Sequence, residues 1–135
     1  MALLNWSSKY SVGVQSMDSQ HTILFGILND LHDAMMKGKA RTVAGELLRK
    51  LANYADEHFA AEEALMASAG YSNLAQHRIL HRDLTKEVEE FVARYERGES
   101  TLNLHLLNFL RDWLTNHIEK EDHKYGAWMN EHGIR

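Results

Sequence analysis

The segment from His58 to His81 reads HFAAEEALMASAGYSNLAQHRILH, and it largely determines the architecture of the chain. His58 and Glu62 lie four residues apart, and so do His77 and His81. Residues at this spacing share one face of an α-helix. Gly70 lies between the two pairs, and glycine commonly ends a helix. The segment therefore predicts two consecutive helices that each direct a pair of potential metal ligands to one side.

Outside this segment, apolar residues also recur at helical spacing. Proline is absent, which favours long helices because proline breaks a helix interior. With Gly38, Gly70 and Gly98 as stops, we expect helices at roughly 18–37, 41–69, 73–97 and 102–130. Short links between long helices favour antiparallel neighbours. The predicted fold is therefore all-α, an up-down-up-down four-helix bundle.

The segments outside the helices carry weaker signals. Residues 1–17 show no helical period, so we expect an extended N-terminal arm that packs its aromatic side chains on the bundle. Asn73 followed by Gln76 resembles a capping box at the start of the third helix. The chain shows no internal repeat or change of composition, and we expect residues 1–135 to form a single domain.

Composition narrows the class of protein. The chain has no cysteine, which excludes disulfides, thiolate nucleophiles and cysteine-based metal sites. The net charge is −4 with acids and bases interspersed, which argues against a nucleic-acid partner. No signal-peptide pattern is present, and no apolar run approaches the ~18 residues of a membrane span. We expect a cytoplasmic monomer without a membrane partner.

Seven potential metal ligands fall at the same end of the predicted bundle. Because successive helices run in opposite directions, the seven residues lie at similar heights along the bundle axis, which agree to within roughly one to three helical turns. A buried ionised carboxylate is costly unless it is paired or binds a metal. Seven donors at one level favour a dinuclear centre with both carboxylates bridging. The donors are His21, His58, Glu62, His77, His81, His117 and Asp122.

One pair departs from regular helical spacing. His117 and Asp122 are five residues apart, which separates them by about 140° on a regular α-helix. Either the bundle axis lies between the two side chains or the helix is locally widened. A π-bulge would widen it, and such bulges are frequent at functional sites.

The donor set restricts the choice of metal. Imidazole nitrogen suits zinc, copper, iron and nickel. A single tetrahedral zinc needs only four ligands, so seven donors fit it poorly. Three imidazoles on one ion and two on the other would leave the second ion an open position, where a small ligand can bind.

The chain resembles the bacterial hemerythrins over nearly its whole length. The matching motifs are Tyr10-Ser11-Val12-Gly13-Val14, Asp18-Ser19-Gln20-His21, His58-Phe59-Ala60-Ala61-Glu62-Glu63, His77-Arg78-Ile79-Leu80-His81, and Trp113-Leu114 with His117-Ile118, Asp122 and Tyr125. The resemblance implies a non-haem di-iron centre that binds O2 reversibly. It further implies two Fe ions joined by an oxo or hydroxo bridge.

The resemblance also implies a role for each donor. His77, His81 and His117 would hold one iron, and His21 and His58 would hold the iron that has the vacancy. Glu62 and Asp122 would bridge the two ions.

A closed apolar pocket around the vacancy would keep out water and protons, so that O2 leaves unchanged. Three residues match pocket positions of the family, namely Trp113, Leu114 and Ile118. Three others lie within two turns of His21 and are expected to complete the wall, namely Leu24, Phe25 and Leu28. The remaining histidines are read as structural: His32, His105, His123 and His132. Tyr125 is read as a packing aromatic.

Three classes of function fit these features. The first is O2 storage or delivery, with O2 as the ligand and an unidentified protein that receives it. The second is a di-iron enzyme for peroxide or nitric oxide reduction, oxygenation or ferroxidase-type oxidation. No histidine here has a glutamate three residues before it, unlike the Glu-x-x-His motif of ferritin-like di-iron enzymes. The third is an O2 or redox sensor module. The first is favoured, so we expect a protein that is not an enzyme.

Overall fold

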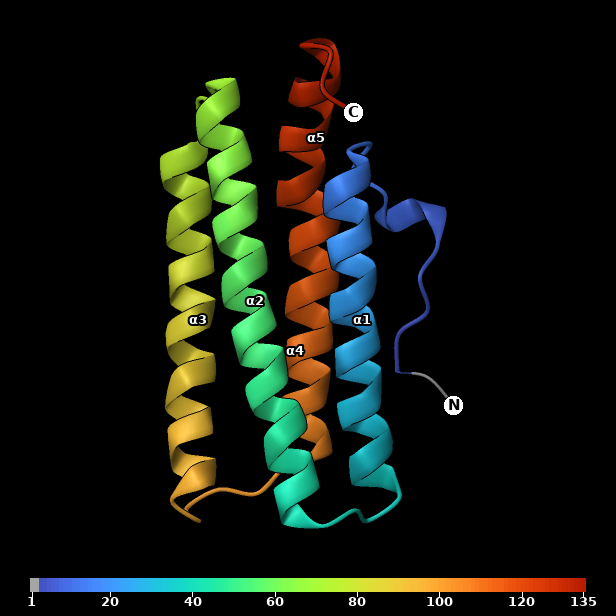
Figure 1. Ribbon diagram of the computed structural model, residues 1–135, viewed down its shortest axis with the longest axis vertical. Helices are drawn as coiled ribbons and strands as arrows, with labels where there is room; N and C mark the ends of the chain where they lie inside the picture. The colour runs from blue at the N-terminus through green and yellow to red at the C-terminus, as the bar shows by residue number, and fades with distance from the viewer. Residues whose placement is uncertain (1–2) are drawn as a thin grey trace.

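Four helical columns run side by side in alternating directions in the computed structural model, which describes residues 3–135 (Figure 1). The first three are α1 (Gln15–Met36), α2 (Arg41–Ala69) and α3 (Leu74–Glu96). The fourth is continuous and consists of α4 (Leu104–His117), the π-helical segment η2 (Ile118–Asp122) and α5 (His123–Glu131). Residues 3–135 contain no strand. The prediction of an all-α four-helix bundle is confirmed.

The start of α1 differs from the expected position. The helix begins at Gln15, whereas the sequence placed its start near residue 18. Asp18 explains the difference, because its carboxylate accepts hydrogen bonds from the Val12 amide at 2.8 Å and the Ser11 hydroxyl at 2.6 Å. The helix already begins between these partners, at Gln15. Asp18 therefore lies inside the helix and fixes the preceding arm to it.

The N-terminal arm is not extended throughout, since Ser8–Tyr10 forms the short 3-10 helix η1. Its aromatic residues pack on α1 as expected, with the rings of Trp6 and Tyr10 at 5.4 and 5.0 Å from the ring of Phe25. Figure 1 shows the arm lying along the outside of α1. The arm thus covers one face of the bundle next to the first helix.

The link between α2 and α3 positions the two donor pairs. Gly70 ends α2 with φ of 77°, a left-handed conformation that glycine adopts without strain. The expected capping box is wrong, because the Asn73 side chain makes no capping hydrogen bond. A capping residue usually has an extended backbone, and Asn73 has φ −93° and ψ 17°. Asn103 does have an extended backbone, and it caps α4 by accepting from the Leu106 amide at 2.9 Å.

Apolar side chains from all four columns fill the space between them. The fully buried members of this core include Leu31, Met66, Leu107 and Met129. Near one end the core gives way to polar residues that are also buried. Among residues 3–135, no helix combines the length and the apolar character needed to cross a membrane.

Candidate metal centre

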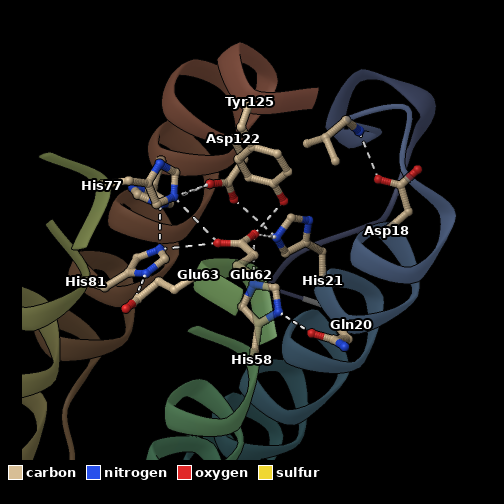
Figure 2. Close-up of polar contacts among 12 residues, drawn as sticks. Asp18, Gln20, His21, His58, Glu62, Glu63, His77, His81, Asp122 and Tyr125 are labelled. Carbon is tan, nitrogen blue, oxygen red and sulfur yellow. Dashed lines mark hydrogen bonds and ion pairs between the residues drawn. The ribbon is translucent and has the colours of Figure 1, made fainter. Parts of the chain in front are cut away.

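The seven predicted donors converge inside the bundle. Figure 2 labels all of them except His117. Each column contributes at least one of them, and none is more than 7% exposed. Their nitrogen and oxygen atoms fall into two groups, with the atoms of each group within 4.8 Å of one another. The first group contains Glu62, His77, His81, His117 and Asp122, and the second contains His21, His58 and Glu62.

Glu62 belongs to both groups, and its two oxygens face in different directions. Oε2 lies 3.0 Å from Nε2 of His21 and 3.2 Å from Nε2 of His58. Oε1 lies 3.2 Å from Nε2 of His81 and 3.5 Å from Nε2 of His77. One carboxylate therefore spans the two groups of imidazoles.

Asp122 has the same arrangement on the opposite helix. Its Oδ1 lies 3.0 Å from Nε2 of both His77 and His117. Its Oδ2 lies 3.1 Å from Nε2 of His21. Both carboxylates thus offer one oxygen to each group, as bridging ligands between two cations do.

The spacing of the donor atoms fits a metal better than hydrogen bonding. Nε2 of His117 lies 3.1 Å from Nε2 of His81 and 3.2 Å from Nε2 of His77. Ligands about 2.1 Å from one ion and at right angles are roughly 3.0 Å apart. Oε1 of Glu62 and both carboxylate oxygens of Asp122 are buried without a hydrogen-bond partner, although imidazole nitrogens lie close to them. Such orphaned acceptors are costly in a dry interior, and cations would satisfy them.

The π-helical segment brings His117 and Asp122 to one side of the fourth column. Residues Ile118–Asp122 form the π-helix, with one helical turn widened by an extra residue. On a regular α-helix, side chains five residues apart would diverge by about 140°. The hypothesis of a local π-bulge is confirmed, and the bulge explains why both side chains reach the first group.

Two imidazoles are oriented by side chains that the sequence reasoning did not identify (Figure 2). Nδ1 of His58 lies 2.7 Å from Oε1 of Gln20, and Nδ1 of His81 lies 2.9 Å from Oε2 of Glu63. A carboxylate oxygen can only accept, so the proton of His81 resides on Nδ1. In the neutral ring the inward Nε2 then carries a lone pair, which is the state that a metal requires.

Tyr125 is more than the packing aromatic that the sequence suggested. Its hydroxyl donates a hydrogen bond of 2.6 Å to Oε2 of Glu62, and the side chain is fully buried. Burial and the negative charges of Glu62 and Asp122 raise the pKa of Tyr125 well above its usual value. The sequence does indicate that Tyr125 lies near the donors, because it follows Asp122 by three residues and so shares its helical face.

In the metal-free protein, protons on His21 and His77 partly neutralise the negative charge of the two carboxylates. Burial lowers the pKa of His21 and His77, but hydrogen bonds to Asp122 and Glu62 outweigh it and raise both values to about 9. Burial likewise raises the pKa of each carboxyl, and here too the neighbouring histidines prevail. The pKa values of Glu62 and Asp122 thus lie below the usual range. The site is built for anionic carboxylates surrounded by positive charge.

An apolar cavity of about 40 Å³ lies beside the donors, because two of its lining residues, Phe59 and Trp113, stack on His81 and His117. This volume exceeds the roughly 10–15 Å³ that one water-sized molecule needs. Four of the six predicted wall residues line it, namely Leu24, Leu28, Trp113 and Leu114, and the lining also includes Leu51, Ala52, Ala55, Phe59, Leu84, Val88 and Leu110. Two of the six do not. Phe25 points to the N-terminal arm, where it contacts Trp6 and Tyr10, and Ile118 is packed in the core.

The four remaining histidines lie outside the two donor groups of residues 3–135. His123 points away from the centre, with Nε2 at 2.6 Å from the Ser11 carbonyl oxygen. His132 stacks on Trp128, while His105 is exposed and His32 is only partly buried. None of the four therefore lies among the side chains that converge at the candidate centre.

Comparison with known proteins gives a consistent result. The family model described as "Hemerythrin HHE cation binding domain" matches residues 12–129. A protein of Methylococcus capsulatus named "Bacteriohemerythrin" is 35% identical over 131 residues, covering 96% of this chain and 99% of the relative. One of the same name from Stenotrophomonas maltophilia is 36% identical, covering 98% of this chain and 85% of the relative.

A solved structure supports the same assignment. A crystal structure described as wild-type hemerythrin matches with a TM-score of 0.90 and 35% identity, covering 93% of this chain and 97% of the solved one. The sequence matches, the bundle and the buried cluster of imidazoles and carboxylates agree with one another. The chain therefore belongs to the hemerythrin family.

Proposed function

We propose that this chain binds dioxygen reversibly at a pair of iron ions held by the seven convergent side chains. The observation that supports this most strongly is the orientation of Glu62 and Asp122. Each carboxylate offers one oxygen to the three-imidazole group and the other to the two-imidazole group. A protein that held one ion would have no need for this double arrangement.

The donor count suggests where a small ligand binds. Three nitrogens, from His77, His81 and His117, and two carboxylate oxygens face one ion. Only two nitrogens, from His21 and His58, and two oxygens face the other. The second ion therefore has one protein ligand fewer, which favours it as the place for O2.

Two ferrous ions, when bound, would supply the two electrons that dioxygen takes up and returns. The chain itself contributes a dry pocket next to them. The cavity lining includes Leu24, one turn after His21, and Phe59, whose ring stacks on His81 at a centroid distance of 3.9 Å. Its lining residues carry no carboxylate, histidine or hydroxyl group. This lining therefore offers no acid or base to process a substrate, which favours reversible binding over catalysis.

The proposal is tested by metal analysis combined with visible spectra. We expect two irons per chain, a colour that develops when the reduced protein meets air, and loss of that colour on degassing. One zinc per chain would contradict the di-iron centre. Irreversible bleaching with turnover of an added substrate would contradict reversible binding.

A variant of His58 tests whether O2 binds at the ion held by His21 and His58. His58→Ala removes one of the two imidazoles on the second ion, so we expect lower iron content or loss of reversible colouring. His105→Ala is a suitable control, because His105 is exposed and lies outside the donor groups. Unchanged O2 uptake in His58→Ala would contradict the role given to this histidine.

A further inference from the structure

The two imidazoles that have an outer side-chain partner differ in the charge of that partner. Nδ1 of His58, in the two-imidazole group, donates to the neutral amide oxygen of Gln20 at 2.7 Å. Nδ1 of His81, in the three-imidazole group, donates to the carboxylate of Glu63 at 2.9 Å. Figure 2 shows these contacts on the outer sides of the two rings. The two halves of the centre are therefore electrostatically unequal beyond the ligands themselves.

The His81–Glu63 contact is held from several sides. The ring of Phe59 stacks on His81 with an interplanar angle of 9°, which fixes the plane of the imidazole. Arg78 binds the other carboxylate oxygen of Glu63 at 3.3 Å. Glu63 and His81 also line a surface hollow of about 240 Å³ between α2 and α3. Glu63 thus lies between His81 and solvent, and its contacts with His81 and Arg78 set its position.

A carboxylate that accepts from the outer nitrogen of a ligating imidazole increases the electron density on the inner nitrogen. Charge-assisted hydrogen bonds are roughly twice as strong as neutral ones, so a carboxylate polarises the ring more than an amide does. Such outer partners raise the basicity of the ligand, and a more basic ligand favours the higher charge on the metal. The effect is directed at the ion that His81 faces.

We propose that Glu63 is a positioning and tuning residue that lowers the reduction potential of the iron facing His77, His81 and His117. This inference rests on the di-iron centre proposed above. The neutral partner Gln20 gives His58 no such bias. The ion in the three-imidazole group is therefore the one whose ferric state is preferentially stabilised, while the ion with the vacancy remains easier to reduce.

The test removes the charge of the Glu63 side chain while keeping its shape. Glu63→Gln retains a hydrogen-bond acceptor for His81 but removes the negative charge. In the iron-loaded protein titrated with dithionite, we expect one of the two one-electron steps to move to a higher potential. The expected size is tenfold in the ferric-to-ferrous preference, which is about 59 mV for a one-electron couple. Gln20→Glu is the reciprocal variant, and it should lower the potential of the other step.

A second readout does not involve iron redox chemistry. Mutation of an outer partner typically weakens metal binding 10–100-fold. Glu63→Gln leaves His81 with a neutral and therefore less polarising partner, so Co²⁺ titration of the metal-free variant should give at least tenfold weaker binding. Glu57→Gln is the control for net charge, because Glu57 is exposed on the same helix, and the outer partners of His58 and His81 are Gln20 and Glu63. We expect this control to leave both potentials and the Co²⁺ affinity unchanged.

The outcomes separate this inference from the proposed function. If Glu63→Gln binds two irons and colours reversibly with unchanged potentials, the inference is wrong and the proposed function stands. If the potential shifts only in Glu63→Leu, which removes both charge and acceptor, the role is geometric and the charge argument is wrong. If the unaltered protein takes up no pair of irons, the proposed function is wrong, whatever the Glu63 variants show.

Discussion

The hydroxyl of Tyr125 in α5 and Oε2 of Glu62 in α2 are joined by a hydrogen bond of 2.6 Å, and both side chains are fully buried. The same oxygen faces His21 and His58. Because the pKa of Tyr125 is raised, its hydroxyl stays protonated and donates to the carboxylate. This bond connects the fourth helical column directly to Glu62 of the second, the carboxylate that spans the two groups of imidazoles.

Tyr125→Phe removes this donor and leaves the ring in place. Hydrogen bonds to charged groups contribute about 1.5–3 kcal/mol, so we expect the free energy of unfolding of the metal-free protein to fall by that amount. Urea unfolding measures the loss. Tyr71→Phe is the matched control, since Tyr71 is also buried, against Trp128, and lies outside the donor cluster, so we expect a smaller loss than for Tyr125→Phe. Equal stability of the two variants would contradict the importance of the Tyr125 hydrogen bond.

The sequence predicts the helices well where a local rule governs them. The apolar period and the absence of proline locate the four columns, and the observed α2 at Arg41–Ala69 has the expected bounds. The five-residue spacing of His117 and Asp122 indicates a π-bulge as one of two possibilities, and the structure has the bulge at Ile118–Asp122. The predicted start of α1 is wrong, because the observed start depends on hydrogen bonds from the arm to Asp18.

The donors could be found from the sequence but their supporting residues could not. Imidazoles and carboxylates at helical spacing are a local pattern, visible within one helix. Gln20 supports His58 from a position 38 residues away, so the contact depends on how α1 packs against α2. Glu63 reaches His81 across the α2–α3 interface in the same way. Such contacts arise only from the three-dimensional packing of the bundle.

Gly126 is a position where even a methyl group should not fit. A Cβ atom built there would lie 2.0 Å from the backbone carbonyl oxygen of Val12, and backbone cannot move aside cheaply. We expect Gly126→Ala to lower the free energy of unfolding by about 1–3 kcal/mol, measured by urea unfolding. Gly26→Ala is the control, because a Cβ at Gly26 in α1 has no atom within 4 Å.

The control should change stability in the opposite direction. Alanine is favoured over glycine inside a helix by roughly 0.8–1 kcal/mol, so Gly26→Ala should stabilise the protein. Destabilisation by both variants would show that the close approach of the N-terminal arm to α5 is not what restricts Gly126.

The apolar cavity provides a test of ligand access. Ala52 is buried in its wall, and Ala52→Leu adds three carbon atoms to a space of about 40 Å³. We expect O2 affinity to fall at least tenfold, about 1.4 kcal/mol, while iron content stays at two per chain. Oxygen titration of the reduced protein, followed by visible absorption, measures the change. Ala64→Leu adds the same atoms at an exposed position on the same helix and should have no effect.

The stability of the metal-free protein should depend on pH in a direction fixed by the donor cluster. The pKa values of His21 and His77 rise from 6.5 to about 9, so their contribution is complete below pH 6.5 and is lost as the pH rises through 9. The pKa values of Glu62 and Asp122 are lowered, so their contribution is complete above about pH 4.5 and is lost on further acidification. The free energy of unfolding should therefore be highest between these limits.

Urea unfolding at several pH values tests this dependence in metal-free protein. Between pH 6.5 and 9 each histidine changes stability by up to about 1.4 kcal/mol per pH unit. Removing one of the two histidines in His21→Gln should make the decline shallower. Bound metal should reverse the trend, because it requires neutral imidazoles and competes with their protons, so metal affinity should increase over the same pH range. A metal-free protein equally stable at pH 6 and pH 9 would contradict the charge arrangement described for the centre.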